Sequence, residues 1–479
     1  MEEVFLSKRE ETLAKNTVAF AIGNFASKLL QIVLVPFYTR VLTKGEYGTV
    51  DILQAAVALL IPIFALAIYE SVFRFSMEKE QDKSAVLTVG LVITVLGVVA
   101  MCLIGFALAF FVSPLYVWLV IANTAANALW TSLSQYTKAI GRTALFTVNS
   151  VLTTFLVLVL NVVFLVPLQL GITGYMLGYT LANFLSGLML ILCLKKDFKI
   201  DFKKINAPLV RQMLIYALPL LLNGICWWLS SFTDRIMIFT MLGDEENGLY
   251  AAASKIPHIL AVLVTIFYQA WQISANLEYD AEDASGFYSK TNEQNIAFTL
   301  LAASAMIVLC RPISTVFLGA EYSSAWVFIP TLVLSTAFFS FAQFLISIYT
   351  AHKKTKMAFI TNIIGTVINV VLNAVLIPIM GALGAAIATT VSYFVLWLVR
   401  VFDTQRLVKI SYKIPRLIIS SIIIVAQAIL ITLDLDYVIT YTVSSIGLLL
   451  VAILYRDVVI SLFRFCIGFI KKIFVKEKK

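Results

Sequence analysis

The stretch Asn24-Phe-Ala-Ser27-Lys28-Leu-Leu-Gln31 places a lysine near the middle of an apolar run that extends from about residue 16 to residue 41. At 1.5 Å per residue, a helix over this run is about 39 Å long, which exceeds the roughly 30 Å hydrocarbon core of a bilayer. Asn24, Ser27, Lys28 and Gln31 have the spacing i, i+3, i+4, i+7 and therefore share one helix face. Because a charge at this depth costs about 2.5 to 3.5 kcal/mol, we predict that this face meets water or protein rather than lipid.

Lys28 admits two interpretations. In the first, the polar face around it lines an aqueous cavity that accepts an anionic substrate. In the second, Lys28 is paired with an acidic side chain and only holds helices together. We favour the first, because ionisable residues inside membrane spans usually mark substrate or ion pathways.

The composition is that of a polytopic membrane protein. Of the 479 residues, 61% are hydrophobic and 13% are charged, whereas soluble domains carry about 25% charged residues. The net charge of +9 is accounted for by Lys and Arg in the predicted loops on one side of the membrane. We therefore expect no nucleic-acid partner. The five cysteines lack zinc or redox spacing, and nucleotide-binding and hydrolase motifs are absent from the sequence. We therefore expect no metal site, no cofactor and no enzymatic activity.

Apolar runs of spanning length follow one another along the whole chain. They predict an all-α polytopic membrane protein with about 14 transmembrane helices. The split at Ser113-Pro114 depends on a single proline between two long runs. The runs cover residues 16–41, 47–75, 84–112, 114–139, 144–167, 171–194, 211–241, 247–277, 287–310, 324–351, 356–378, 382–402, 414–433 and 437–455.

Basic residues predict the orientation of these helices. Lys and Arg are concentrated in the connections on the side of the N-terminus and in the C-terminal tail, whereas the opposite connections carry acids such as Asp244, Glu245 and Glu246. By the positive-inside rule, both termini are cytoplasmic. The basic residues on that side include Arg74, Lys138, Arg142, Lys195, Lys203, Lys204, Lys354, Arg400, Arg406, Lys413, Arg416, Lys471 and Lys479.

The chain contains two similar halves. Because the offset between them covers an even number of spans, both have the same orientation, as in parallel repeats with a substrate path between them near the midplane. We predict an N-lobe of six helices over 1–194, a basic cytoplasmic linker over 195–210, a C-lobe of six helices over 211–406, two further helices over 407–457 and a basic amphipathic tail over 458–479. The matching pairs are Tyr136 with Tyr349, Asn149 with Asn362, Gly171 with Gly381 and Gly174 with Gly384, at spacings of about 213 to 210.

Polar stripes also follow the first two spans of the second half. Asp234 and Arg235 are adjacent in sequence and do not face each other on a helix, so each needs a partner elsewhere. Asp234 is either a cavity residue or the counter-ion of Lys28 or Lys255. The stripe on the span 211–241 consists of Asn223, Trp227, Ser230, Ser231 and Asp234, and that on 247–277 of Tyr250, Ser254, Lys255 and His258.

Three further residues have competing interpretations. Arg40 and Arg74 lie near predicted helix ends, where they either line the rim of the cavity or extend toward lipid headgroups. His258 is either a hydrogen-bonded packing residue or a proton carrier.

Several short stretches carry a family resemblance: Asn16-Thr-Val-Ala-Phe20, Gly23-Asn24, Ser27-Lys28, Pro36-Phe-Tyr-Thr-Arg40, Gly45-Glu-Tyr47-Gly48 and Asn373-x4-Pro378-x2-Gly381-x2-Gly384. Their order over nearly the whole chain resembles the multidrug/oligosaccharidyl-lipid/polysaccharide (MOP) exporter superfamily. Within it, the chain is most similar to the bacterial polysaccharide-transporter branch, the Wzx-type flippases. The resemblance implies a V-shaped pair of helix bundles with a central basic cavity.

The resemblance also implies a function. Such a flippase moves an undecaprenyl-pyrophosphate-linked oligosaccharide, a repeat unit of capsule, O-antigen, teichoic acid or exopolysaccharide, from the inner to the outer leaflet of the bacterial cytoplasmic membrane by alternating access. The expected partners are this anionic lipid, membrane lipids and a polysaccharide polymerase, and the coupling ion, Na⁺ or H⁺, stays open. The predicted substrate-binding residues are Lys28, Arg235, Lys255, Asn24, Gln31, Arg40, Asp234, His258 and Arg74.

Two other functions compete with this one. A cation-coupled multidrug exporter of the same superfamily needs acidic residues inside the membrane, and Asp234 is the one clear mid-span acid in the sequence. A membrane-embedded glycosyltransferase needs paired catalytic acids in a large outer loop, and the predicted outer loops are short. The cationic stripe therefore favours an anionic substrate.

Overall fold

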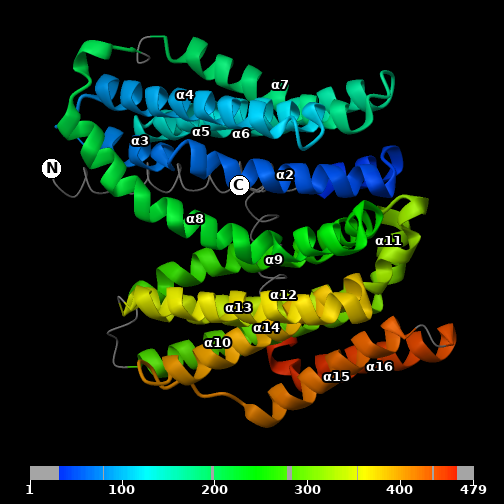
Figure 1. The fold of residues 1–479 in the computed structure, drawn as a ribbon. Coiled ribbons are helices and arrows are strands. Elements are labelled where there is room, and N and C mark those ends of the chain that lie inside the picture. Colours follow the sequence, from blue (N-terminus) through cyan, green and yellow to red (C-terminus); the bar gives the residue numbers. More distant parts are fainter. Residues whose placement is uncertain are drawn as a thin grey trace, which may run out of the picture. The chain divides into compact units, whose positions relative to one another are not determined.

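The structure is a computed structural model that describes residues 32–78, 80–195, 199–277, 283–352, 354–433 and 436–460. Within these ranges every regular element is a helix (Figure 1). Ten described helices are long and apolar enough to cross a membrane, and the bent pair α10 (Ala284–Val308) and α11 (Cys310–Phe317) adds an eleventh if it forms one span. The prediction of an all-α polytopic protein is confirmed. Residues 16–31 of the first predicted span and the tail beyond residue 460 lie outside the described residues.

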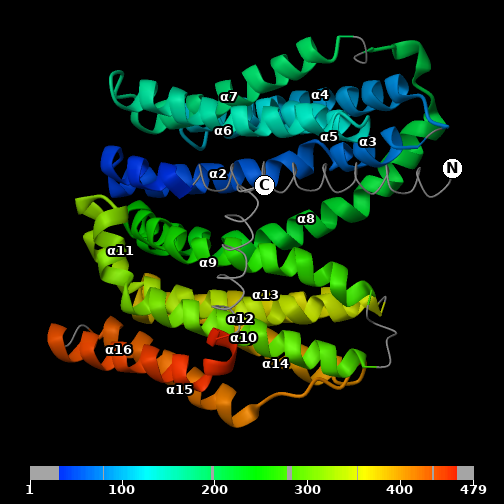
Figure 2. The same ribbon diagram turned by 180° about the vertical axis from the view of Figure 1, so that it is seen from behind.

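The chain forms two compact units, Met1–Phe239 and Thr240–Lys479. In unit 1, α7 packs against both α5 and α6, which touch each other less (Figures 1 and 2). Its described elements are a helix over Ile32–Val41, α2 (Lys44–Phe64), α3 (Ile68–Ser76), α4 (Lys83–Leu108), α5 (Pro114–Ala139), α6 (Thr143–Leu165), α7 (Gly171–Cys193), the short 3-10 helix η1 (Phe202–Lys204) and most of α8 (Ala207–Leu242).

Unit 2 repeats this local arrangement, because α14 packs against both α12 and α13. The predicted sequence repeat therefore corresponds to a repeated three-helix packing. Besides α10 and α11, the described elements of unit 2 are α9 (Asp244–Leu277), the 3-10 helix η2 (Ala320–Val327), α12 (Ile329–Ala351), α13 (Thr355–Met380), α14 (Ala382–Thr404), α15 (Ile414–Thr432) and α16 (Tyr437–Leu454).

Two predicted spans are not continuous helices. The run 47–75 is broken between α2 and α3, where Leu66 and Ala67 adopt left-handed backbone angles with φ of 49° and 48°. Pro62, inside the last turn of α2, lacks a backbone N–H and loosens the helix just before this break. The run 287–310 continues into α11 after a bend of 67°, and Pro312 in the first turn of α11 follows that bend.

Helix α8 runs antiparallel along α2 and α3 within unit 1. Four contacts show the opposite directions of the chains, because the residue numbers increase along α2–α3 while they decrease along α8. Asp51 contacts Arg235, Ala55 contacts Trp228, Pro62 lies beside Gly224 and Ser71 contacts Met213. This packing explains why the compact boundary lies at residue 239 rather than in the sequence linker 195–210. The division into two six-helix lobes stays a prediction.

Buried amides join helices inside each unit. In unit 1, Asn149 of α6 accepts from Trp130 of α5 at 2.9 Å and donates to the carbonyl of Ser186 of α7 at 3.0 Å. In unit 2, Asn369 of α13 donates to Thr389 of α14 at 3.1 Å. Hydrogen bonds of this kind replace the hydrophobic effect, which is weak between helices in lipid.

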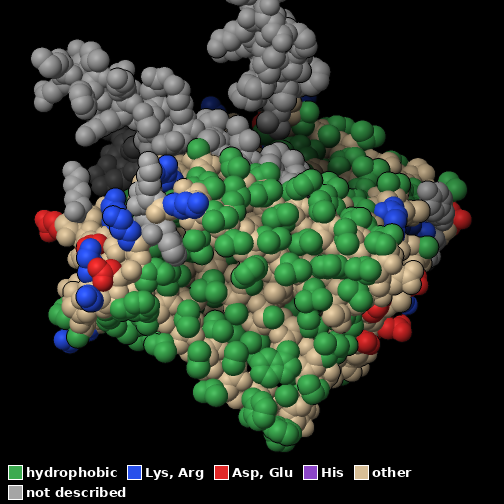
Figure 3. All heavy atoms as spheres, turned by 90° about the horizontal axis from the view of Figure 1, so that it is seen from above, with side chains coloured by type: hydrophobic (Ala, Val, Ile, Leu, Met, Phe, Trp, Pro, Cys, Tyr) green, Lys and Arg blue, Asp and Glu red, His purple; other side chains and the backbone are tan. Residues whose placement is uncertain are grey.

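The surface of the helices matches a bilayer. Figure 3, seen from the side where α4 and α7 lie in Figure 1, shows a face largely covered by hydrophobic side chains, with charged side chains toward its edges. Exposed residues on this part of the chain include Leu96, Leu103 and Phe184, at 61%, 71% and 57% of their full area. A continuous apolar surface of this size is typical of lipid contact.

Connections predicted to share a membrane side lie together within each unit. At one end of unit 1, Lys204 of the basic linker pairs with Asp82 before α4 at 2.8 Å. In unit 2, the backbone N–H of Ser411 donates to Ser289 Oγ at 2.9 Å. These contacts agree with the alternation of spans on which the predicted orientation is based.

Candidate functional site

The predicted substrate-site residues fall into three groups. Asn24, Lys28 and Gln31 lie outside the described residues. Arg40, Arg74, Asp234 and Arg235 belong to unit 1, and Lys255 and His258 belong to unit 2.

The centre of the described site in unit 1 is an ion pair between α8 and α2. Arg235 donates from Nη1 to Asp51 Oδ1 at 2.8 Å, and the two side chains are 18% and 8% exposed. Asp51 Oδ2 is buried and has no hydrogen-bond partner among the described residues. The prediction that Arg235 finds its partner away from Asp234 is confirmed. Removal of one member of such a pair destabilises a protein because the other charge loses its buried partner.

Aromatic rings on α8 flank the guanidinium of Arg235. Trp228, Phe232 and Arg235 have the spacing i, i+4, i+7 and so lie on one face of α8. Trp228 donates from Nε1 to the carbonyl of Ala55 at 2.7 Å and stacks on Phe232 with 5.9 Å between ring centroids. The Arg235 guanidinium lies 5.5 Å from the Phe232 centroid, within range of a cation–π contact. This face of α8 is therefore fixed against α2.

The predicted polar stripe of α8 lies on a different face. Each α-helical residue turns by about 100°, so Asp234 points away from the face of Phe232 and Arg235, whereas Ser231, one turn before Arg235, lies at the border between the two faces. Asn223 and Ser231 are exposed and Asp234 is half-buried. The side chains of Trp227 and Ser230 lie outside the described part. Asp234 thus stays a predicted site residue on a face separate from the ion pair.

The polar stripe of α9 is partly accessible. Lys255 is half-buried and His258 is exposed, whereas Tyr250 at the start of the stripe is 3% exposed. Pro257 lies inside the helix between Lys255 and His258. Tyr250 packs edge-on against Phe328 with 6.0 Å between ring centroids, so it is a packing residue of unit 2.

Arg40 and Arg74 lie at opposite ends of the α2–α3 region. Arg40 is exposed and donates from Nη1 to the carbonyl of Pro36 at 2.8 Å. Arg74, in the last turn of α3, is 54% exposed and 3.5 Å from Glu78. Both positions are compatible with headgroup contact, and a role at the rim of a cavity stays a prediction for each.

Sequence reasoning missed one intramembrane cation. Arg400, assigned above to a cytoplasmic connection, is 0% exposed inside α14. It donates to Thr361 Oγ1, Asn362 Oδ1 and the carbonyl of Ala342, at 3.1, 2.7 and 2.8 Å. All three acceptors are neutral. Arg400 lies two residues before the end of the predicted span 382–402, where contact with lipid headgroups is the simpler interpretation.

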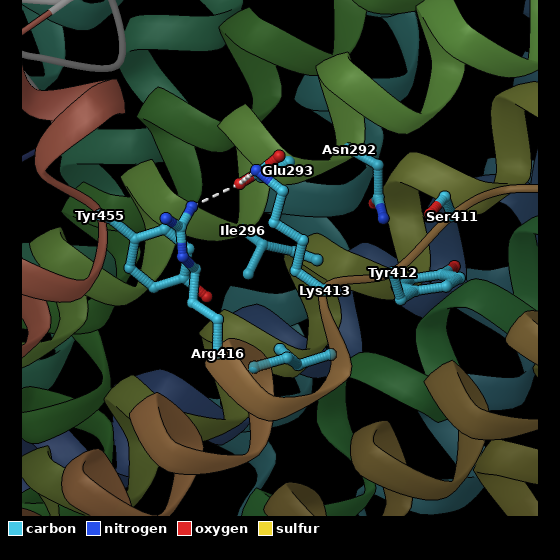
Figure 4. Close-up of a pocket in the computed structure, with 9 residues that line it drawn as sticks. Asn292, Glu293, Ile296, Ser411, Tyr412, Lys413, Arg416 and Tyr455 are labelled. Carbon is cyan, nitrogen blue, oxygen red and sulfur yellow. Dashed lines mark hydrogen bonds and ion pairs between the residues drawn. The ribbon is translucent and has the colours of Figure 1, made fainter.

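A second charged cluster lies at the start of α15. Glu293 of α10 accepts from Lys413 at 2.8 Å and from Arg416 at 2.5 Å, and Figure 4 shows its carboxylate facing both cations. Arg416 also contacts Asp457 at 3.2 Å. Beside this cluster is a cavity of about 20 Å³, which has room for one water. Tyr412 lines this cavity, and burial raises the pKa of its hydroxyl.

This second cluster has two acids and two cations, so its charges balance. It joins α10 to the helices α15 and α16, which have no counterpart in the first half. The balance of charge makes it a structural connection rather than an anion site.

The long apolar helices define a multi-pass membrane protein with ionisable side chains inside its helices. A family model described as MatE matches residues 219–375. A second, described as "Polysaccharide biosynthesis protein", matches residues 13–272. The chain belongs to this polysaccharide biosynthesis family, which confirms the resemblance to the MOP superfamily.

Solved structures with the same fold include transporters and a flippase. A lipid II flippase, MurJ, in an inward closed conformation has a TM-score of 0.70 at 15% identity, with 92% of this chain and 100% of that chain covered. An inward-facing multidrug resistance MATE family transporter of the MOP superfamily has a TM-score of 0.62 at 14% identity, with 80% and 95% covered. A Vibrio cholerae MATE transporter has a TM-score of 0.55 at 15% identity, with 84% and 97% covered. The comparison with curated proteins found no match. At these identities the likeness concerns the fold.

Proposed function

We propose that the protein moves an oligosaccharide linked through pyrophosphate to a polyprenyl lipid from the inner to the outer leaflet of the bacterial cytoplasmic membrane. The observation that carries this proposal is the polysaccharide biosynthesis family match over residues 13–272. That region contains both the predicted Lys28 stripe and the Asp51–Arg235 pair.

The chemistry of the substrate explains the choice of side chains. A pyrophosphate headgroup does not cross hydrocarbon unaided, and charge-assisted hydrogen bonds from Lys and Arg replace part of its hydration. In this proposal, Lys28 attracts the headgroup, and Arg235 exchanges the Asp51 carboxylate for a phosphate oxygen. Arg suits this exchange because its planar guanidinium binds carboxylate and phosphate in similar bidentate geometries.

The proposal needs no covalent chemistry. The sequence contains no nucleotide-binding motif, so an ion gradient, the membrane potential or consumption of the product outside supplies the drive. Each elementary charge that moves across the membrane contributes about 2.3 kcal/mol per 100 mV.

The proposal can be tested with the full chain in liposomes. A fluorescent polyprenyl-pyrophosphate oligosaccharide in the inner leaflet becomes accessible to a membrane-impermeant quencher when it is flipped. We expect Lys28→Ala to abolish flipping and Lys28→Arg to retain part of it. Lys356→Ala, which changes an exposed lysine at the start of α13, serves as the control. Full flipping by Lys28→Ala, with normal insertion, would contradict the proposal.

The MatE match over residues 219–375 favours one second function, export of cationic drugs. Cells that express the chain would then lose ethidium faster than cells with an empty vector. Ethidium efflux together with an absence of oligosaccharide flipping would replace the first proposal by the second.

A further inference from the structure

Helix α2 ends at a strained cap inside a predicted span. The backbone N–H of Ala67 donates to the carbonyl of Pro62 at 2.9 Å, and that of Leu66 donates to the carbonyl of Ile63 at 3.3 Å. This pair of bonds forms a Schellman motif, in which the residue after the C-cap has left-handed backbone angles and is usually glycine. Here that residue is Leu66 with φ of 49°, and Ala67 follows with φ of 48°. Two consecutive residues therefore adopt a conformation that L-amino acids disfavour.

A continuous helix over the same segment avoids this cost. In such a helix, the N–H of Ile68 would donate to the carbonyl of Phe64, whereas in the structure it donates to the carbonyl of Ala65 at 2.9 Å. Straightening therefore exchanges backbone hydrogen bonds and returns both left-handed residues to the favoured helical region. Pro62 already lies inside α2, so its cost is the same in both forms.

Contacts with α4 and α8 hold the break. At Gly97, α4 approaches the carbonyl of Phe64 so closely that a Cβ atom would clash with it. On one side of the break, the Asp51–Arg235 pair joins α2 to α8. On the other side, Ser71 Oγ of α3 donates to a backbone carbonyl of α8 at 2.6 Å. A strained backbone persists only where the surrounding contacts determine it, so loss of these contacts favours the straight form.

The two sides of the break are held unequally. Four of the nine residues of α3 are buried, against seven of the 21 residues of α2. Ile68 and Val72 of α3 are 0% exposed, and Val72 packs where a Cβ atom of Gly90 in α4 would lie. We therefore take α3 as the fixed side and α2 as the moving side. Because α2 has 21 residues and is about 31 Å long, a rotation of about 10° at the break moves its first residues by about 5 Å.

We propose that the break at Leu66 and Ala67 is a hinge about which α2 moves while α3 stays fixed. The bent form is the strained one, and it straightens when the contacts between α2 and α8 open. In the proposed function, a phosphate oxygen replaces the Asp51 carboxylate on Arg235 and so opens the ion pair. This trigger rests on the proposed function, whereas the hinge itself does not.

The inference can be tested by double electron–electron resonance on the full chain in liposomes, with the native cysteines replaced. One spin label is placed at Lys44→Cys, the first residue of α2, and the other at Ser113→Cys, an exposed residue before α5. We expect two populations of distances between the labels, one of which matches the structure. Ala67→Gly removes the left-handed cost of the bent form and should increase that population.

Matched variants separate this effect from others. Ala65 and Ala67 are both 2% exposed, but Ala65 has φ of −81°. Ala65→Gly therefore removes the same buried methyl group without relief of a left-handed residue, and the low helix propensity of glycine is common to both variants. The population ratio should shift about tenfold further in Ala67→Gly than in Ala65→Gly. Leu66→Ile keeps the side-chain volume but adds a β-branch, which makes a positive φ more costly, so it should shift the ratio the other way. Leu59→Ile, inside α2, is its control.

One distance population in the parent and in all four variants, or equal shifts by the two glycine variants, overturns the inference. Flipping of the oligosaccharide is scored separately on the same proteins. Two populations without flipping would retain the hinge and remove the proposed function. Flipping with a single population would retain the function and remove the hinge.

Discussion

Leu190 and Arg400 occupy matching positions in the two repeats, and both are completely buried. The spacing of about 210 that relates Gly171 to Gly381 also relates Leu190 to Arg400, and both side chains are 0% exposed. In unit 1 this position is part of an apolar core, whereas in unit 2 it is a hydrogen-bonded cation. The two repeats therefore share a packing scheme but differ in charge at one core position.

The first prediction tests this difference. Arg400→Leu places the residue of the first repeat into the second and leaves Thr361, Asn362 and the Ala342 carbonyl without their donor. We expect a loss of about 2 to 4 kcal/mol in unfolding free energy, because each orphaned acceptor costs about 1 to 3 kcal/mol and the removed charge offsets part of this. Thermal unfolding in detergent measures the loss. Arg406→Leu, at a side chain that is 83% exposed, should change little, and equal stability of both variants would contradict the prediction.

The second prediction concerns the pair that joins α2 and α8. Asp51→Asn or Arg235→Gln alone should each destabilise the protein by about 3 to 5 kcal/mol, because the remaining charge stays buried. The double charge reversal Asp51→Arg with Arg235→Asp should recover part of this loss. Arg74→Gln is the matched control, since the Arg74–Glu78 pair is exposed and such pairs contribute about 0 to 1 kcal/mol. Additive losses in the charge reversal would show that the two residues do not interact.

The third prediction concerns the attachment of α15. Glu293→Gln removes the negative charge of the carboxylate shared by Lys413 and Arg416. Hydrogen bonds to charged groups contribute about 1.5 to 3 kcal/mol, so amide exchange in the first turns of α15 should accelerate by about tenfold or more. Mass spectrometry after deuterium labelling checks this region directly. Glu321→Gln, at an exposed residue of η2, should leave exchange in α15 unaltered.

The fourth prediction is a pH dependence at the start of α4. The hydrogen bond from Lys204 holds the pKa of Asp82 below its usual value. A lowered folded-state pKa stabilises the protein above the unfolded value of about 3.9, and this contribution is lost as the pH falls through the folded-state pKa. Asp82→Asn should remove the dependence below about pH 4 but retain the helix cap, whereas Asp82→Ala should also lose the cap, at a cost of about 1 kcal/mol. Acid titrations of thermal stability compare the three proteins, and parallel curves for the parent and Asp82→Asn would refute the prediction.

The sequence was sufficient for the type of the elements because long apolar runs have few alternative structures in lipid. It predicted about 14 spans, whereas ten described helices, or eleven with the bent pair, are long and apolar enough to cross a membrane. The break at Leu66 and Ala67 could not be foreseen, since neither residue type favours a left-handed conformation. The unbroken apolar run 47–75 predicted one continuous helix there.

The contacts that the site residues make were harder to predict than the site residues themselves. The sequence indicated that Arg235 needs a distant partner, but Asp51 lies 184 residues away, and only the antiparallel packing of α8 along α2 identifies it. Arg400 could not be separated from ordinary helix-end cations, because its burial depends on contacts with α12 and α13. Lys28, on which the substrate prediction was first built, stays a prediction.

Helix α8 has 36 residues, so it is about 54 Å long and exceeds a hydrocarbon core of about 30 Å by about 24 Å. The stretch that meets the criterion for a membrane span is Ala207–Cys226, so tilt or emergence into the headgroups must accommodate the rest of the helix. The acyl-chain length of the surrounding lipids therefore acts on the depth at which Arg235 meets Asp51. A membrane that changes its lipid composition with temperature would shift this depth without any change in the protein.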